Sequence, residues 1–516
     1  MGSDGAPEGR RRIVMLVDNG VNGDSRVQKE ARSAAEAGWD VTLLGRSPDR
    51  QTHTWSLGPA KVRLLPMSVS LAKRPHEFRR QWLRAPLAYP PTGVGAMRAQ
   101  LVRAWKADLQ AERAKQPGGL RAAGLEARWF AARAYGKWVT LRRGASSRAR
   151  EARKRLDTPA DRLYTWFWQK AQGHRSWRRI EPGLWDWEIA YGPVIDELKP
   201  DLIHANDFRM IGVGARAKIR AKARGREVKL VWDAHEFLPG VRPWTEHERW
   251  RIGHMAHERE YVPYVDAAVT VSEDLATMLQ ESHGLAESPV VVLNTPAVEH
   301  APEELTEGEG DSPVTDLRAM CDVGADVPLL VYSGAAAPQR GLDIMVEALP
   351  QQPGVHVALV TNNHHSAFMV RLMDRARELG VLDRVHLLSY VPHWQVVPML
   401  SGADLGVIPI HHWPNHEIAL ITKFFEYSHA RLPLVVSDVR TMAATVRATG
   451  QGEVFKAEDV ADYVRAVRAV LDDPERYRSA YDKPGLLDGW TWSAQAELLT
   501  GVYRKLLGDG TPRGEQ

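Results

Sequence analysis

Buried parallel strands are the feature that most constrains the fold of this chain. Near-continuous apolar runs recur along the sequence, and each is followed by residues with the spacing of a helix. Strands that are apolar on both faces indicate a parallel sheet covered by helices on both sides. The clearest runs are PLLVYSG (328–334), VHVALVTNN (355–363), RVHLLSY (384–390), ADLGVIPI (403–410) and LPLVVSD (432–438).

A similar series precedes these runs. It begins with RIVMLV, a helix over about 26–38 and the strand WDVTLLG, and it continues with PDLIHAND (200–207), VKLVWDAHE (228–236), AAVTVSE (267–273) and PVVVLNTP (289–296). An acidic segment containing Gly and Pro, 299–312, is a plausible linker between the two series. The sequence thus predicts two doubly wound α/β domains, over 11–310 and 313–485. An amphipathic helix follows over 488–508. Ligands of such sheets lie at the carboxyl ends of the strands, and two facing domains make a cleft there.

The segment from about 70 to 190 interrupts the first domain with a basic, helical composition. Between Leu71 and Arg179 it has 26 Lys and Arg against 7 Asp and Glu, and the segment holds nine of the 18 tryptophans. Residues 125–143 read as a basic, partly amphipathic helix, which suits an anionic membrane surface. The alternatives are a helical hairpin packed on its own domain, or nucleic acid, which ranks last because no nucleic-acid module is recognised.

The bulk composition predicts a soluble cytoplasmic protein. A single cysteine, Cys321, cannot form an internal disulfide and fits a reducing compartment. The N-terminus has no secretory apolar region, and no run approaches the ~18 apolar residues of a membrane span. With the basic insert, this predicts a cytoplasmic protein that can also bind the inner face of the plasma membrane.

The segment from Asn415 to Asp438 carries the most chemistry. Lys423 and Glu426 lie three residues apart on a predicted helix that precedes the run LPLVVSD. A cation and a carboxylate together suit a nucleotide, because the cation faces diphosphate and the carboxylate accepts from ribose hydroxyls. The alternative is a surface ion pair.

This segment resembles the donor-binding segment of the family 4 glycosyltransferases, which are retaining enzymes of the GT-B fold. The matching residues are Asn415, Lys423, Glu426, Tyr427, Pro433 and Ser437. The resemblance covers about 11–65 and 190–507 and implies that Glu426 holds the donor ribose. The family usually carries another Glu eight positions earlier. Here that position is Ile418, and Glu417 is one residue off.

The resemblance extends to two further donor-side segments. In YSGAAAPQRG, Gly334 matches the family, Arg340 stands at a usual Lys position, and Ala335 stands where an Arg is usual. Arg340 would grip the diphosphate, and we expect Lys423 to supply the missing second cation. In SYVPHW, Tyr390 and Val391 match an element whose backbone meets the base, and Asn362 is a further candidate there.

The N-terminal half resembles the family in DSRVQKEARSAAEAGWDVTLL and in VWDAHEFLPG. The first strand-to-helix loop contains Gly20, which lets backbone N–H groups approach the donor. The resemblance implies that His235 contacts the transferred sugar. Asp233 and Glu236 either orient His235 or bind the acceptor, and Asn206 is a further candidate on the acceptor side.

The predicted reaction is sugar transfer from a nucleoside diphosphate sugar to a sugar, lipid-linked or small-molecule acceptor, with retention of configuration. No cofactor and no metal are expected, because the paired histidines lack zinc-like spacing and no D-x-D motif is present. Arg340 and Lys423 would neutralise the leaving diphosphate. The alternatives are a nucleotide-sugar epimerase on the same architecture, or a non-catalytic nucleotide-sugar or glycan sensor, since fold alone does not fix activity.

Overall fold

The structure is a computed structural model that describes residues 10–69, 71, 85–90, 93–114, 118–241, 247–297 and 315–508. The proposed linker 299–312 therefore lies outside the described residues. The chain divides into two compact units, which are described separately. The first comprises Met1–Met67, Trp187–Val241 and Glu258–Gln516, and the second comprises Ser68–Asp186 and Arg242–His257.

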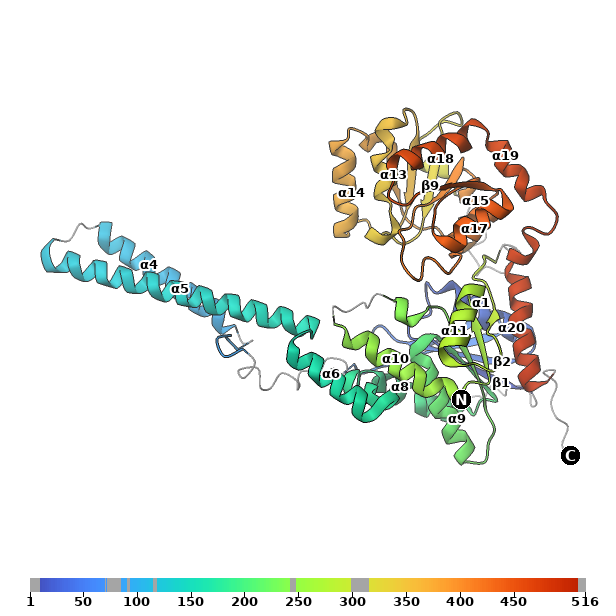
Figure 1. The fold of residues 1–516 in the computed structure, drawn as a ribbon, viewed down its shortest axis with the longest axis horizontal. Coiled ribbons are helices and arrows are strands. Elements are labelled where there is room, and N and C mark those ends of the chain that lie inside the picture. Colours follow the sequence, from blue (N-terminus) through green and yellow to red (C-terminus); the bar gives the residue numbers. More distant parts are fainter. Residues whose placement is uncertain are drawn as a thin grey trace. The chain divides into compact units, whose positions relative to one another are not determined.

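The first unit contains two sheets (Figure 1). The N-terminal sheet has eight strands and is parallel except at one edge, where β3 runs antiparallel to β4. In spatial order its strands are β3 (His53–Leu57), β4 (Ala60–Leu65), β2 (Asp40–Arg46), β1 (Arg12–Leu16), β5 (Leu202–Asn206), β6 (Lys229–Ala234), β7 (Ala267–Thr270) and β8 (Val290–Val291).

The C-terminal sheet has six parallel strands, as the buried apolar runs predict. In spatial order they are β11 (Val385–Leu388), β10 (His356–Val360), β9 (Leu329–Ser333), β12 (Leu405–Ile408), β13 (Leu434–Ser437) and β14 (Gly452–Phe455). Every residue of β9, β12 and β13 is buried, which accounts for their unbroken apolar sequence. The two predicted parallel α/β domains are thus confirmed.

Helices cover both faces of the C-terminal sheet. One apolar cluster joins the sheet to α13 (Asp343–Glu347), α14 (Ala367–Glu378), α18 (Val460–Asp472) and α19 (Pro474–Arg478). A second cluster joins it to α12 (Leu317–Cys321), α15 (His393–Leu400), α16 (Thr422–His429) and α17 (Arg440–Thr449). The helix α16, which carries Lys423 and Glu426, follows β12 and precedes β13 in the chain. It packs against the sheet that contains these two strands.

The N-terminal sheet is covered on one face by the first and the last long helices of the described chain. The helix α1 (Ser25–Glu36) and the helix α20 (Trp492–Leu507) share an apolar cluster with β1, β2 and β4. Trp492 donates from its indole nitrogen to the hydroxyl of Ser33 at 2.9 Å. The remaining helices of this half are α8 (Leu184–Leu198), α9 (Asp207–Ala223) and α11 (Glu273–His283).

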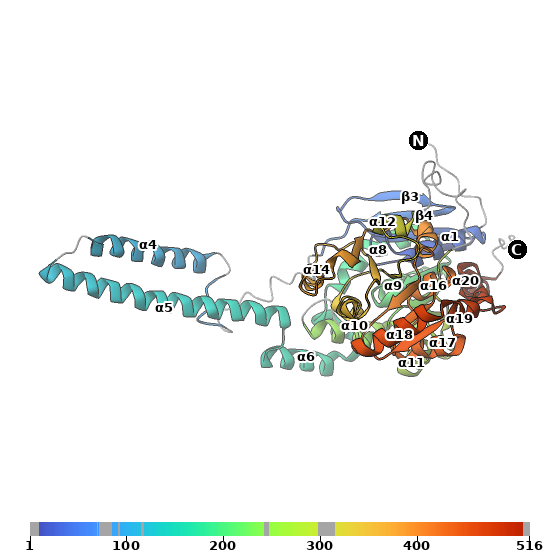
Figure 2. The same cartoon turned by 90° about the horizontal axis from the view of Figure 1, so that it is seen from above.

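The second unit is helical. Its helices are α4 (Val94–Ala114), α5 (Gly119–Arg155), α6 (Pro159–Gln172), α7 (Trp177–Ile180) and most of α10 (Arg249–Tyr261). The helices α4 and α5 run side by side (Figures 1 and 2), around a small apolar core of Leu109, Leu125 and Ala132. The start of α10 joins this unit because Arg249 pairs with the buried Asp161 at 2.8 Å, a pairing that no sequence pattern indicates.

Short 3-10 helices connect several of these elements. They are η2 (Gly173–Ser176), η3 (Leu238–Gly240), η4 (Val262–Tyr264), η6 (Pro338–Arg340), η7 (Leu349–Gln351), η8 (Leu382–Arg384), η9 (Ser479–Asp482) and η10 (Asp488–Trp490). The turn η6 matters most here, because it places Arg340 in the loop after β9.

Candidate active site

The predicted site residues follow the carboxyl ends of parallel strands. In the N-terminal sheet, Gly20 follows β1 and Asn206 ends β5. Asp233 is the second-last residue of β6, and His235 and Glu236 follow that strand. In the C-terminal sheet, Gly334 follows β9, Tyr390 and Val391 follow β11, and Asn415 follows β12. Parallel strands bring such positions to one edge of each sheet.

Lys423 is a buried cation on the first turn of α16. Its ammonium lies 3.5 Å from the centre of the Tyr332 ring, a cation–π contact. The backbone of Gly334 leaves room for it, since a Cβ at position 334 would stand 2.8 Å from the Lys423 Nζ. Gly334 also has φ +134°, which a residue with a side chain rarely adopts. Position 334 must be glycine for Lys423 to stand where it does.

Two cations, Lys423 and Arg340, face one another at this position. Burial lowers the pKa of Lys423 well below its usual range, and the nearby guanidinium of Arg340 adds to the effect. No hydrogen bond or ion pair occupies the Arg340 guanidinium among the described residues. Two like charges held together without a shared counterion suit an anion that binds both.

Glu426 lies one turn after Lys423 on the same helix. Burial raises the pKa of Glu426, while the ammonium groups of Lys423 and Lys29 oppose that shift. Its carboxylate makes no hydrogen bond or close ion pair within the described part of the chain. The pair is therefore no surface salt bridge, and the carboxylate is available to accept from hydroxyl groups.

Eight positions before Glu426, Ile418 stands where the resemblance leads one to expect a carboxylate. Ile418 is buried, and its carbonyl accepts from the Ser272 hydroxyl. The neighbouring Glu417 contacts the His412 ring at 2.6 Å and accepts from the Arg440 backbone N–H at 2.8 Å. These contacts hold Glu417 at the start of α17, so Glu417 does not substitute for the missing carboxylate.

The residues predicted near the base lie beside the same helix. The backbone N–H of Tyr390 donates to the Asn362 side chain at 3.2 Å. Burial raises the pKa of Tyr390, and the carboxylate of Glu426 adds to the effect. The side-chain oxygen of Asn415 is buried and accepts no hydrogen bond from a described residue. A Cβ on Gly240, from the N-terminal half, would stand 3.0 Å from it.

His235 is held by a buried ion-pair network. Its Nε2 lies 3.2 Å from Asp233, and the Arg26 guanidinium binds Asp233 through both of its oxygens at 2.8–3.0 Å. Burial opposes the charge on His235, but Asp233 outweighs it and raises the pKa of His235 to about 9. Asp233 is fully buried, and its contact with Nε2 orients the His235 ring.

Acidic groups surround His235. Glu236 has its pKa raised by burial and faces both His235 and Arg340. Asp207, which the sequence analysis did not single out, has φ +65°, a strained value for a residue with a side chain. Burial raises the pKa of Asp207 to about 7. The preceding Asn206 is buried, and neither end of its amide makes a hydrogen bond to a described residue.

The loop containing Gly20 is shaped by its own polar groups. The Asn19 side chain accepts from the Val21 backbone at 2.8 Å and donates to Asp24 at 2.6 Å. Asp24 then caps the N-terminus of α1. Gly23 has φ +87°. Among the described residues, no hydrogen bond joins Gly20 to Arg340 or Lys423.

One group of described residues could supply metal ligands: Glu30, His204 and Asp233, whose ligand atoms lie within 4.8 Å of one another. Arg26 pairs with two of them, at 2.9 Å from Glu30 and 2.8 Å from Asp233. Its guanidinium already provides the positive charge that a metal would bring, so the donor set fits an ion-pair network better than a metal site. Metal independence stays a prediction.

Three further charged residues of this region, Arg26, Lys29 and Glu30, lie on α1 and were not predicted from the sequence. Arg26 and Glu30 occupy fixed positions of the family pattern in the segment DSRVQKEA, so the pattern could have indicated them. No pattern in the sequence indicates the position of Lys29 next to Glu426.

Two family models match separate parts of the chain. Residues 119–297 match Glycosyltransferase Family 4, and residues 321–483 match Glycosyl transferases group 1. The first match begins inside the 70–190 segment, which the sequence analysis placed outside the resemblance. Together the two matches cover about two thirds of the chain.

Curated relatives agree with the family models. The chain is 25% identical over 306 residues to D-inositol 3-phosphate glycosyltransferase of Nocardia farcinica, which covers 53% of this chain and 66% of that protein. It is 28% identical over 182 residues to glycogen synthase of Mycobacterium tuberculosis, which covers 34% of this chain and 42% of that protein. The chain therefore spans less than two thirds of the length of these relatives.

Solved structures share the fold. Sucrose-phosphate synthase from Thermosynechococcus elongatus superposes with a TM-score of 0.59 at 16% identity, over 96% of this chain and 99% of the other. Anabaena HepE, solved in complex with UDP-glucose, gives 0.55 at 13% identity, over 96% and 100%. The α,α-trehalose-phosphate synthase from Burkholderia xenovorans gives 0.54 at 13% identity, also over 96% and 100%. At such identities the likeness shows the fold alone.

The family matches, the two parallel-sheet domains and these shared folds agree with one another. The chain belongs to the family 4 glycosyltransferases and has the GT-B fold.

Proposed function

We propose that this glycosyltransferase moves a sugar from a nucleoside diphosphate sugar to a hydroxyl acceptor with retention of configuration. The observation that carries the proposal is the pairing of two cations, Arg340 and Lys423, with the available carboxylate of Glu426 one turn away. The cations match a diphosphate and the carboxylate matches ribose hydroxyls. A UDP-sugar is the first donor to test, because HepE was solved with UDP-glucose.

The chemistry follows from the charges. Negative charge builds on the diphosphate as the bond to the sugar breaks, and Arg340 and Lys423 stabilise it. An oxygen of that diphosphate takes the proton of the acceptor hydroxyl on the same face of the sugar, which retains the configuration. His235, charged at neutral pH, stands beside Glu236, which faces Arg340. The sugar would therefore lie between His235 and the cations. No cofactor and no metal enter this scheme.

The acceptor would meet the carboxyl ends of β5 and β6. Asn206 offers an unpaired buried amide there, and Asp207 and Glu236 offer carboxyl groups that accept from hydroxyls. This favours a polyhydroxylated acceptor, either a free sugar or polyol or the sugar of a lipid-linked precursor. The relative from Nocardia farcinica is named for an inositol phosphate acceptor, so inositol phosphates belong in the first acceptor panel.

The test is a donor and acceptor screen. The purified chain is incubated with UDP- and GDP-sugars, and binding is measured as thermal stabilisation, because a bound donor raises apparent stability by mass action. Release of nucleoside diphosphate that depends on acceptor, with a product of unchanged anomeric configuration by NMR, supports the proposal. Formation of an epimer of the donor sugar without acceptor would favour an epimerase. Binding of the donor without sugar transfer to any acceptor tested would favour a sensor.

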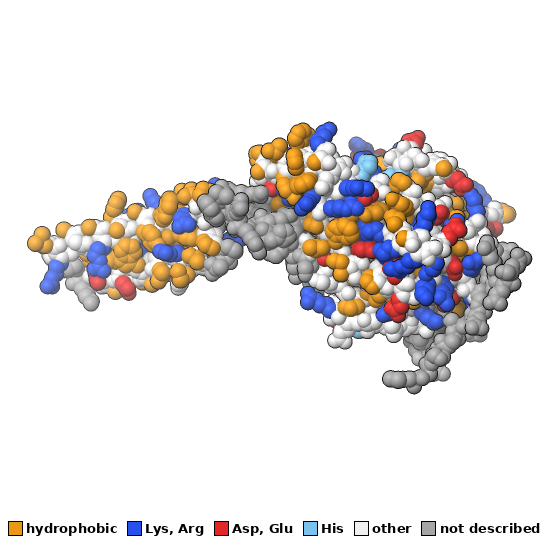
Figure 3. Space-filling model, turned by 90° about the horizontal axis from the view of Figure 1, so that it is seen from below, with side chains coloured by type: hydrophobic (Ala, Val, Ile, Leu, Met, Phe, Trp, Pro, Cys, Tyr) orange, Lys and Arg blue, Asp and Glu red, His pale blue; other side chains and the backbone are white. Residues whose placement is uncertain are grey.

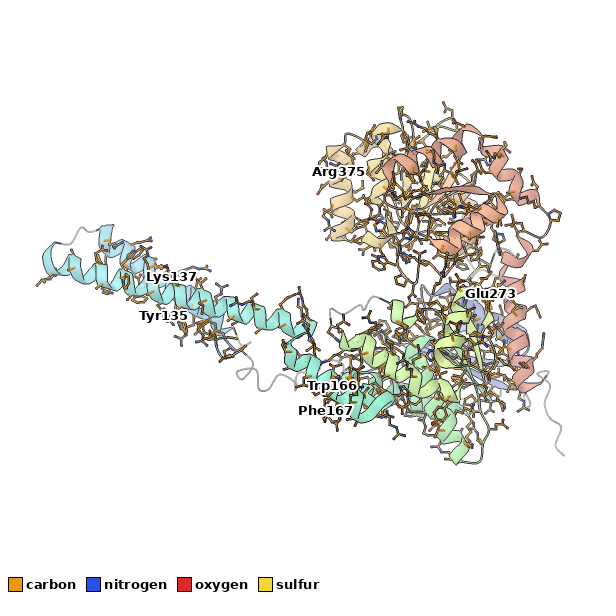
Figure 4. The ribbon with its side chains drawn as sticks, in the orientation of Figure 1. Tyr135, Lys137, Trp166, Phe167, Glu273 and Arg375 are labelled. Atoms are coloured by element: carbon orange, nitrogen blue, oxygen red, sulfur yellow. The ribbon has the colours of Figure 1, made fainter. Side chains whose placement is uncertain are left out.

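We also propose that the second unit binds an anionic membrane surface. No described helix is both long and apolar enough to cross a bilayer. However, α5 exposes Leu120, Phe130, Trp138 and Leu141, and α6 exposes Leu163, Trp166 and Phe167. In Figure 3 hydrophobic and basic side chains alternate along the α4–α5 hairpin, and Figure 4 labels Trp166 and Phe167 on α6. Aromatic side chains interleaved with Arg and Lys are typical of interfacial helices.

Vesicle flotation tests the membrane proposal. The chain should float with anionic phosphatidylglycerol vesicles at low salt, less at high salt and little with neutral vesicles. The double variant Phe130→Ser and Trp138→Ser should float less. Leu498→Ser is the control, because Leu498 is an apolar side chain on α20 of the first unit that is about as exposed as Trp138. Equal flotation of all three proteins would contradict the proposal.

A further inference from the structure

Lys29 on α1 is a partly buried cation that the proposed mechanism does not use. Its ammonium donates to the Asn294 side chain at 3.0 Å and to the Thr295 carbonyl. It also lies over the Trp492 ring, 4.6 Å from the ring centre. Lysine usually keeps its ammonium in water, so three contacts from two other segments of the chain indicate a specific task.

Asn294 links this lysine to α16, the helix that carries Lys423 and Glu426. Its side-chain oxygen accepts from Lys29, and its side-chain nitrogen donates to the hydroxyl of Thr422 at 3.0 Å. A charged ammonium can only donate, so it fixes which end of the amide faces Thr422. Thr422 is the first residue of α16, and Lys423 follows it directly. A continuous chain of hydrogen bonds thus runs from α1 to the first turn of α16.

Lys29 also faces the carboxylate of Glu426. Two ammonium groups, from Lys423 and Lys29, favour the ionised form of this partly buried carboxylate. Lys423 comes from the same helix, while Lys29 comes from the N-terminal half. Because Glu426 has no other close partner among the described residues, its charge depends on these two lysines.

We propose that Lys29 and Asn294 are positioning residues for the donor: they hold the first turn of α16 so that Lys423 and Glu426 face the nucleotide. The proposal rests on the proposed function, because it assigns α16 to donor binding. Neither residue needs to touch the donor. The N-terminal half would then set donor affinity through a hydrogen-bond chain rather than through direct contact.

The proposal carries a pH dependence. Burial and, to a lesser extent, the neighbouring Arg26 lower the pKa of Lys29 to about 7, although Glu426, Glu30 and Asp24 oppose the shift. These are the charged groups that face Lys29 from α1 and from α16, and its partners Asn294, Thr295 and Trp492 do not titrate. Lys29 is therefore charged at pH 6 and largely neutral at pH 8. Donor affinity should fall across that range.

Direct binding is the first measurement. Affinities for UDP-glucose and GDP-mannose are measured by calorimetry at pH 6 and pH 8, since neither donor has a phosphate group that titrates between these values. Lys29→Met should weaken binding of the preferred donor about tenfold or more at pH 6. It should also raise the donor KM more than it lowers kcat. Lys29→Arg keeps the charge at both pH values and should reduce the pH dependence, leaving the part that Lys423 contributes.

Asn294→Ala provides a second, independent variant. It should weaken donor binding to a similar degree, and the double variant Lys29→Met with Asn294→Ala should be no weaker than either single variant, because both break one chain. Lys218→Met is the control, since Lys218 lies on α9 and pairs with Asp266, which directly precedes β7 and is not a residue of the site. It should bind donor normally.

The outcomes separate the two proposals. If the wild-type chain binds no nucleotide sugar, the proposed function fails and the inference fails with it. If the wild-type chain binds donor and folded Lys29→Met and Asn294→Ala bind it equally well, only the inference is overturned. A wild-type affinity that does not change between pH 6 and pH 8 would overturn the role of the Lys29 charge.

Discussion

The side-chain nitrogen of Lys423 lies 3.5 Å from the centre of the Tyr332 ring, at a position that is open only because residue 334 is glycine. The aromatic face stabilises the ammonium, while the positive charge of Arg340 disfavours it. A lysine held this way is preorganised, so an arriving diphosphate need not order it. Burial and the neighbouring guanidinium both disfavour the charge in the empty site, and an anion relieves both effects.

Removing either cation should slow sugar transfer more than it destabilises the fold. Lys423→Met and Arg340→Ala should each lower kcat about 10²–10³-fold, as the loss of a preorganised charge donor does. The steady-state rate with the preferred donor and acceptor is the measurement. Lys456→Met is the control, because Lys456 is an exposed lysine of the same half that pairs with Asp459. Near-normal rates in both site variants would contradict the assignment.

Gly334→Ala should abolish donor binding through a steric effect. The added methyl group would meet the Lys423 ammonium at 2.8 Å and displace it. The variant also places a side chain at φ +134°, which costs about 1–2 kcal/mol. Gly354→Ala separates the two effects, since Gly354 has φ +78° with nothing near its Cβ. Both variants should lose stability in thermal unfolding, but only Gly334→Ala should lose donor binding.

Arg26→Met should destabilise the N-terminal half strongly. It leaves Asp233 and Glu30 buried without the cation between them, and breaking a buried pair in this way typically costs about 3–5 kcal/mol. Urea unfolding monitored by circular dichroism gives the loss. Arg504→Ala, which removes an exposed pair with Glu497, should cost less than about 1 kcal/mol. Similar losses in the two variants would show that the network does not hold this half.

Activity should fall at alkaline pH as His235 loses its proton. Asp233 raises the pKa of His235 to about 9, despite burial, so the cation persists through neutral pH. Because this pKa is raised above its ordinary 6.5, the ion pair contributes fully to stability below about pH 6.5 and is lost as the pH rises through about 9. The pH profile of kcat/KM should show this limb, and His235→Gln should be slower and lack it.

The parallel strands could be predicted because burial on both faces leaves an unbroken apolar sequence. The strands β3 and β14 were missed for the opposite reason. Every residue of β3 is at least partly exposed, and β14 is a half-exposed strand at the edge of its sheet. Their sequences therefore lack the signal that identifies the central strands.

The candidate site was predictable where its residues lie close together in sequence. Lys423 and Glu426 share one helix, so their spacing alone placed them together. Arg26 and Asp233 are separated by 207 residues, and only the order of strands β1, β5 and β6 brings them into contact. The same holds for Lys29, whose neighbour Glu426 belongs to the other half of the first unit. Long-range pairs of this kind follow from topology rather than from local pattern.

The contact between α1 and α20 has a consequence for biosynthesis. Ser33 and Trp492 are hydrogen-bonded across 459 residues of sequence, so the ribosome must make nearly all of the described chain before the first sheet gains its last covering helix. Until then, the apolar face that Leu499, Val502 and Tyr503 cover stays open to water. Such a nascent chain should need chaperone protection for most of its synthesis.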